Sequence, residues 1–177
     1  QALGTQARIR DDLKKKGLLK EFDEEVRKQI DSGAAGLVTE EELQAWEASG
    51  GALHYLTMFG VNQPSHAGHK LRVVLNMKMA NTHSGLSPNE CMGKPPNSLV
   101  PLLSVLMWWR TSPHCAVVDI SRVYQGVKTG PQEKFMRLAL WKETEDSPWR
   151  VIGYNTMTYV DLAAAAGLEL AKGVAAK

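Results

Sequence analysis

The glycine pair Gly50–Gly51 separates a part of the sequence with helical spacing from a part with strand-like segments, and this change most constrains the fold. Before the pair, apolar side chains recur every three to five residues, as on an amphipathic helix, at Leu13, Leu18, Leu19, Phe22, Val26 and Ile30. Small residues interrupt this pattern at 32–36, and a capping-box pair, Thr39 and Glu42, opens a second helix that runs to Trp46. Residues 1–50 are therefore predicted to form a helical hairpin.

After the glycine pair, two extended segments are separated by residues typical of turns. His54–Val61 and Lys70–Met79 are predicted to pair as a β-hairpin, and the Gly- and Pro-rich residues 81–97 are predicted to form a loop. Further segments are an apolar helix (98–110), a short buried strand (115–120), an antiparallel strand pair (134–141 and 150–158) and an alanine-rich helix (161–176). The sequence therefore predicts an α+β fold, a small antiparallel sheet with packed helices.

Composition narrows the class of protein. The chain has 177 residues, 44% hydrophobic and 23% charged, as expected for a soluble globular domain. A net charge of +2 is too balanced to indicate a nucleic-acid binder, although it does not exclude a local basic groove. The longest apolar run, Leu99–Trp109, contains Pro101 and Ser104 and is too short to span a bilayer. We expect no membrane span and no secretory signal.

The two cysteines, Cys91 and Cys115, have neither metal-ligand spacing nor a disulfide framework. Each is therefore predicted to be a small buried hydrophobic residue. This favours a reducing compartment, because thiols stay reduced there. The compartment itself is not determined by the sequence.

Asp119 is the acidic residue with the strongest functional signal, since it ends an otherwise apolar run that starts at Cys115. A carboxylate at such a place is costly unless it has a role. Template-directed polymerases use such an Asp to hold Mg²⁺, and the backbone carbonyl of Ile120 is a second oxygen ligand in this hypothesis. Tyr124 would then lie under the sugar of the incoming nucleotide and exclude a ribose 2′-hydroxyl. Taken alone, an Asp at a strand end or helix cap is the commoner interpretation.

Several motifs occur in a fixed order along the chain: Lys70-Leu-Arg72-Val-Val, Gly85-Leu-Ser-Pro-Asn89-Glu-Cys91, Pro95-Pro-Asn97-Ser-Leu99 and Val118-Asp119-Ile120. Upstream are Leu19-Lys-Glu-Phe22 and His54-Tyr55-Leu56, and downstream is Arg137-Leu-Ala-Leu-Trp141-Lys. In order, spacing and residue type they resemble the reverse transcriptases of BEL/Pao LTR retrotransposons. The resemblance covers nearly the whole chain.

The resemblance implies an incomplete polymerase, with a helical hairpin at 1–50 followed by fingers and a partial palm at 51–177. Arg72 and Lys70 would clamp the nucleotide triphosphate from the fingers hairpin, which a bidentate guanidinium does well. Asp119 would be the first catalytic Asp, with Mg²⁺ as the cofactor and nucleic acid as the partner. For Arg72 taken alone, a solvent-exposed strand charge is the more ordinary interpretation.

The sequence also departs from the family pattern. Leu75 and Asn76 stand where the family has Phe-Asp, and Tyr159-Val160 stands where it has Phe-Gly. Alanines 164–166 replace the family's Ser-Pro-Phe helix start, and the later Asp-Asp pair that completes the metal site is missing. Asp161 is more simply a helix N-cap. Because one carboxylate cannot hold two metal ions, polymerase activity of this chain alone is not expected.

Two alternatives of other classes follow from these departures. One is a domesticated relic that serves as a structural or scaffold subunit and binds protein partners in a larger assembly. The other, weaker one is a module that binds RNA or DNA through the fingers groove.

Three weaker signals have ordinary interpretations. Residues 31–42 have the outline of an EF-hand loop but lack oxygen ligands at Gly33 and Ala35, which favours a plain turn between helices. The five histidines are predicted to be solvated on a loop tip rather than zinc ligands. Trp108 and Trp109 could stack on bases, but a helix buried under the sheet explains them more simply.

Overall fold

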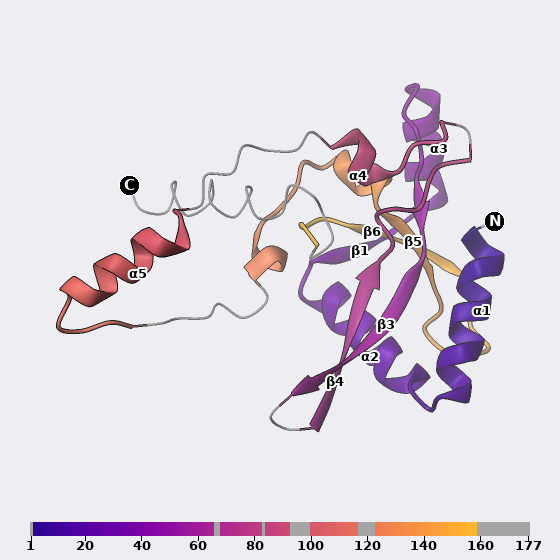
Figure 1. Cartoon of the computed structure of the whole chain (residues 1–177). Coiled ribbons are helices and arrows are strands. Elements are labelled where there is room, and N and C mark those ends of the chain that lie inside the picture. The colour runs from indigo at the N-terminus through magenta and orange to yellow at the C-terminus, as the bar shows by residue number, and fades with distance from the viewer. Residues whose placement is uncertain (1, 66–67, 83, 93–99, 117–122, 159–177) are drawn as a thin grey trace.

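The computed structural model describes residues 2–65, 68–82, 84–92, 100–116 and 123–158 (Figure 1). The α-helices are α1 (Ala2–Lys15), α2 (Leu19–Asp31), α3 (Glu40–Ala48), α4 (Pro88–Cys91) and α5 (Leu102–Thr111), with 3₁₀ helices η1 (Val123–Gly126) and η2 (Glu133–Met136). The strands are β1 (Ala35–Val38), β2 (Tyr55–Leu56), β3 (Met58–Ser65), β4 (Gly68–Leu75), β5 (Leu138–Trp141) and β6 (Arg150–Tyr154). The predicted α+β class is confirmed.

The larger sheet is mixed rather than purely antiparallel. Its strand order is β1-β6-β5-β2, with β1 and β5 antiparallel to β6. The short edge strand β2 runs parallel to β5, and main-chain bonds from His54 N to Phe135 O (2.9 Å) and from Leu138 N to His54 O (3.1 Å) extend that pairing. The expectation of an antiparallel sheet was wrong at this edge. A strand of two residues is too short for its sequence to indicate the direction in which it pairs.

The first fifty residues form three helices, α1, α2 and α3, where the sequence pattern predicted two. A turn with Gly17 in the left-handed region (φ 71°) separates α1 from α2. Apolar spacing continues across this turn, so the sequence pattern predicted a single helix there. The predicted capping box of α3 is confirmed, with Thr39 N donating to Glu42 Oε2 (3.0 Å) and Glu42 N to Thr39 Oγ1 (3.2 Å).

The segment predicted as a turn between helices contains strand β1. Ala35 lies opposite Tyr154, and Val38 lies opposite Val151 in β6. No local signal indicates this pairing, because β6 lies far along the chain. The EF-hand outline at 31–42 therefore contains a strand that belongs to the sheet.

Residues from before and after Gly50 share one core. Phe22 and Val26 of α2 are fully buried against a cluster of strand residues that includes Leu56, Met58, Leu71, Leu75 and Ile152. The helix α1 is tied to the hairpin by Gln6, whose amide donates to Met58 O (3.1 Å) and accepts from Met58 N (2.8 Å). Both helices thus hold the strands that carry the candidate site.

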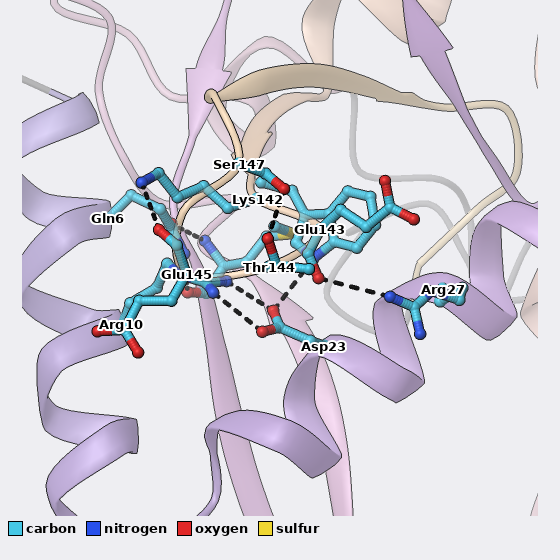
Figure 2. Close-up of polar contacts among 11 residues, drawn as sticks. Gln6, Arg10, Asp23, Arg27, Lys142, Glu143, Thr144, Glu145 and Ser147 are labelled. Carbon is cyan, nitrogen blue, oxygen red and sulfur yellow. Dashed lines mark hydrogen bonds and ion pairs between the residues drawn. The ribbon is translucent and has the colours of Figure 1, made fainter.

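A polar network fastens the two N-terminal helices to the turn between β5 and β6 (Figure 2). Arg10 binds Asp23 through two hydrogen bonds of 2.6 and 2.9 Å, and Asp23 also accepts from Trp141 Nε1 (3.1 Å). Lys14 pairs with Glu145, and Arg27 Nη2 donates to Glu143 O (3.4 Å). We call Arg10, Asp23 and Trp141 the clasp.

The predicted β-hairpin and the β5–β6 pair are confirmed. Strands β3 and β4 pair from Met58 opposite Leu75 to Ser65 opposite Gly68, and Figure 1 shows this hairpin reaching beyond the larger sheet. In the β5–β6 pair, the first residues predicted as strand form η2 instead. The predicted loop at 81–97 contains the short helix α4, where Ser87 N donates to Glu90 Oε2 (2.7 Å).

Burial of the apolar helix and of the cysteines was predicted wrongly. The helix α5 has no buried residue, and Trp108 and Trp109 are 60% and 43% exposed. Cys91 and Cys115 are both exposed free thiols. Apolar composition alone does not bury a side chain, because another element must also pack over it. The predicted helix at 161–176 and residues 117–120 of the predicted strand lie outside the described residues.

No described helix has both the length and the apolar character that crossing a membrane requires.

Candidate functional site

Lys70 and Arg72 occupy one face of the hairpin strand β4. They lie opposite Gln63 and Val61 of β3, and Leu71 between them points to the other face. Lys70 is exposed, Arg72 is half-buried and Leu71 is only 2% exposed. Two residues along a strand span roughly 7 Å, a length comparable with that of a triphosphate. The strand therefore presents two cations on the face away from its buried leucine.

The buried face of β4 is anchored to α2. Leu71 and Leu75 belong to the main core, and Leu71 N donates a hydrogen bond to Glu21 Oε1 (3.1 Å). A backbone amide bound to a carboxylate is a charge-assisted contact. It fixes the backbone between the two cationic residues, so their separation is set by the fold.

Tyr124 lies in η1 and is half-buried, with its carbonyl accepting from Val127 N (3.1 Å). The next residue, Gln125, lines a cavity of about 20 Å³ together with Val73 and Val74 of β4. The structure therefore brings the turn that carries Tyr124 beside the strand that carries Arg72. Such a cavity holds about one water molecule, so a nucleotide would have to bind on the open surface.

The predicted metal ligands, Asp119 and the carbonyl of Ile120, lie outside the described residues. Both are oxygen ligands of the kind that Mg²⁺ prefers. Two metal ions need more carboxylates than this segment carries. Within the described residues, no group of three His, Cys, Asp or Glu side chains could hold a metal ion.

The residues that depart from the family pattern at the end of β4 serve the fold. Leu75 is 2% exposed in the main core. Asn76 is half-buried, and its backbone N–H donates to Thr57 O (2.9 Å). A leucine at this place stabilises the hairpin through apolar burial and offers no ligand oxygen.

His54 was wrongly predicted to be solvated. It is 3% exposed, and its Nε2 lies 2.9 Å from Met79 O. His69 and His114 are exposed as predicted, whereas His66 and His83 lie outside the described residues.

An open groove of about 820 Å³ borders His54, and sequence reasoning missed it. Its lining comes from α1, the end of α3, residues 79–91 and the β5–β6 pair, and includes Leu3, Glu47, Tyr55, Asn81 and Leu86. Burial raises the pKa of the Tyr55 phenol, and the carboxylates of Glu47 and Glu40 raise it further. Because the lining residues are scattered along the sequence, no local motif could have indicated this groove.

Tyr154 is a further polar residue at the β6 end of the site, and it has a structural partner. Its hydroxyl donates to Gln29 Oε1 (2.9 Å) inside the core, and burial raises the pKa of the phenol well above its ordinary value. The side chain therefore stays neutral and ties β6 to α2.

No protein-family description matches the chain, and no curated protein matches it.

Proposed function

We propose that this chain is the fingers and front-palm portion of a reverse-transcriptase-like polymerase, and that Lys70 and Arg72 contact the triphosphate of a nucleotide. The supporting observation is the placement of these two cations on one face of β4, whose other face is held by the core and by Glu21. A rigid arm with paired donors favours phosphate binding, because the donors need little reordering when the ligand arrives.

In this proposal Tyr124 faces the nucleotide sugar, and its segment lies beside β4 through the cavity shared by Gln125 and Val74. Asp119 and the Ile120 carbonyl would offer oxygen ligands to Mg²⁺, which would neutralise charge on the phosphates. The chain binds a nucleotide but does not polymerise by itself, because the other metal carboxylates must come from elsewhere.

The direct test is nucleotide binding by the intact chain in the presence of Mg²⁺, measured by calorimetry with a deoxynucleoside triphosphate. We expect Arg72→Ala to weaken binding about tenfold or more, since a hydrogen bond to a charged group contributes roughly 1.5–3 kcal/mol. Lys70→Ala should weaken it less, because Lys70 is exposed and its ammonium is well hydrated. Asp119→Asn should reduce the dependence of binding on Mg²⁺.

The matched control is Lys78→Ala, which removes one positive charge from an exposed lysine just past the end of β4. This variant should bind the nucleotide like the wild-type protein. No detectable binding by the wild-type chain would refute the proposal, and equal losses for Lys78→Ala and Arg72→Ala would reduce it to a general charge effect.

A structural subunit of a larger assembly is the second candidate, and the roles of Leu75 and Asn76 in the fold favour it. Under this alternative the fold is retained while ligand positions are lost. Asp119→Asn should then leave assembly with protein partners intact. Loss of the complex upon this single substitution would count against it.

A further inference from the structure

Strand β3 is an outer strand of the hairpin, and every second residue along it directs its main-chain N–H and C=O away from β4. Two contacts show which residues these are. Gln6 binds both main-chain groups of Met58 from outside the hairpin. Leu71, which lies opposite Asn62, donates its N–H to Glu21, also outside the hairpin. The outward-facing residues of β3 are therefore Met58, Gly60, Asn62 and Pro64.

Both ends of this outward-facing edge are closed, whereas its middle is open. At one end the Gln6 side chain occupies Met58, and at the other end Pro64 has no N–H to offer. A proline is tolerated inside a strand where an N–H would face away from the partner strand. Between these ends, no described residue outside the hairpin bonds to the main chain of Gly60 or Asn62. We call these two residues the open edge.

A groove of about 650 Å³ runs beside the open edge, and α1 forms its other wall (Figure 1). The strand side of the groove includes both residues of the open edge. On α1 the lining residues recur every three or four positions and so share one stripe of the helix: Thr5, Arg8, Ile9, Asp12, Leu13 and Lys16. This stripe is roughly 16 Å long, the length of about five residues of extended chain.

The walls of the groove combine apolar side chains with a positive rim. Ile9 and Leu18 line the groove, are half-buried and pack against the main core. On the rim, Lys16 is paired with Asp12 at 2.6 Å. Arg8 is exposed, and no described carboxylate pairs with it. Charge complementarity therefore favours an occupant with an acidic side chain near Arg8.

The contact between Gln6 and Met58 indicates which chemical group this edge binds. The Gln6 carboxamide donates to Met58 O and accepts from Met58 N, as a peptide group of an added strand would do. The open edge offers the same pair of groups again at each second residue, a repeat of roughly 7 Å. A polypeptide backbone repeats its donors and acceptors at this spacing, so it matches both residues of the open edge at once.

We propose that the groove between α1 and β3 binds an extended peptide of a partner protein, which adds a strand at the open edge and places an acidic side chain near Arg8. Main-chain hydrogen bonds give this mode its affinity, and contacts of alternate side chains give its specificity. A second copy of this chain fits less well, because pairing through the same edge would bring a second α1 into the groove. The inference is independent of nucleotide binding, because Lys70 and Arg72 lie on β4.

The test uses the synthetic peptide acetyl-Glu-Val-Thr-Val-Glu-Val-amide, titrated into the isotope-labelled full-length protein and followed by NMR. We expect hydrogen exchange at the amides of Gly60 and Asn62 to slow about fivefold or more at saturation, because each N–H gains an acceptor. The amide of Val61, which faces β4, is the internal control and should keep its exchange rate. Unchanged exchange at both open-edge amides at millimolar peptide would overturn the proposal.

The same peptide with every amide N-methylated is the matched control ligand, because it keeps the side chains but lacks main-chain donors. We expect it to leave Gly60 and Asn62 unprotected. Equal protection by the two peptides would show that side-chain contacts alone drive binding, and this would overturn strand addition.

A pair of variants tests the open edge from the side of the protein. Asn62→Pro removes the outward N–H and leaves the ladder to β4 intact, whereas Asn62→Ala removes only the side chain. We expect Asn62→Pro to bind the peptide about fivefold more weakly than Asn62→Ala, which corresponds to the loss of one hydrogen bond. Thermal melts of both variants check that the fold is kept. Equal affinities of the two folded variants would contradict strand addition.

The charge of the occupant is tested by reversing charges on α1. Arg8→Glu should weaken binding of the acidic peptide and strengthen binding of a peptide with lysines in place of its glutamates. Lys15→Glu is the control, because Lys15 is exposed on α1 but does not line the groove. Equal effects of the two variants would overturn the placement of an acidic side chain near Arg8.

Discussion

A single carboxylate, that of Glu21, holds the backbone of β4 between the two cationic residues of the candidate site. The strand is paired with β3 along its length, and the hydrogen bond from Leu71 N to Glu21 ties it in addition to α2. Its loss would leave the amide of a residue that is 2% exposed without its carboxylate acceptor.

We predict that Glu21→Ala lowers the free energy of unfolding by roughly 1–3 kcal/mol, the usual cost of an unsatisfied buried group. Amide hydrogen exchange at Leu71 should accelerate in the same variant. Glu21→Gln keeps an acceptor oxygen and should recover most of the loss. Glu24→Ala is the control, because the Glu24 side chain is half-exposed and its ion pair with Lys20 is long, at 4.0 Å. Unchanged exchange at Leu71 in Glu21→Ala would show that the bond does not hold the strand.

The clasp concentrates charge in a nearly buried place. The side chains of Arg10 and Asp23 are 8% and 14% exposed, and Trp141 Nε1 donates to the same carboxylate. Removing one partner of such a pair leaves the other charge desolvated without compensation.

We predict that Asp23→Ala lowers the free energy of unfolding by about 3 kcal/mol in urea denaturation. The comparison variant is Asp12→Ala, which breaks the pair with Lys16, where both side chains are 59% exposed. That loss should stay below about 1 kcal/mol, because water screens exposed ion pairs. Similar losses of unfolding free energy in the two variants would mean that burial does not strengthen the ion pair of the clasp.

At the scale of elements, the hairpin β3–β4, the β5–β6 pair and the α3 capping box could be predicted, because each depends on residues close in sequence. The strand β1 could not, since its partner β6 is distant and four residues carry little pattern. Burial of α5 was predicted from composition alone, and the described residues leave it uncovered. For the candidate site, Lys70 and Arg72 were predicted from a motif, whereas the groove beside His54 depends on how distant segments pack.

The start of α3 carries the clearest pH-dependent contact among the elements. The hydrogen bond from Lys134 and that from the Thr39 amide lower the pKa of Glu42 below its ordinary 4.5. A lowered pKa in the folded state means that this contribution is fully present above pH 4.5 and is lost as the pH falls through the lowered pKa.

We predict that Glu42→Gln reduces the melting temperature at pH 7. The difference in melting temperature between pH 7 and pH 3 should be smaller in this variant than in the wild-type protein. The effect should be small, because the Glu42 side chain is 42% exposed. Thermal melts across this range check the prediction, with Glu47→Gln, which changes an exposed carboxylate near the other end of α3, as the control. A melting curve that keeps the wild-type pH dependence would rule out a contribution from Glu42.

At the scale of the whole molecule, the first fifty residues are part of the core that supports the site. Phe22 and Val26 are fully buried against the strands, and β1 forms one edge of the larger sheet. The clasp adds a polar contact between the same helices and the β5–β6 turn.

We predict that residues 51–177 expressed alone do not fold cooperatively, because removal of α2 and β1 exposes the apolar strand faces to water. Circular dichroism and a thermal melt would detect this as weak, non-cooperative signal. Adding residues 1–50 as a separate peptide should restore a cooperative transition. A sharp melt of the isolated 51–177 fragment would show that the two parts fold independently.

The contact between Gln6 and Met58 also protects the protein against strand pairing with other copies of itself. The side-chain amide occupies both main-chain hydrogen-bonding groups of Met58, so this end of β3 has no free donor or acceptor there for an incoming strand. Weakening the packing of α1 would therefore expose these main-chain groups to a strand of another molecule. Aggregation, seen as turbidity, would then be detected before a loss of helical signal.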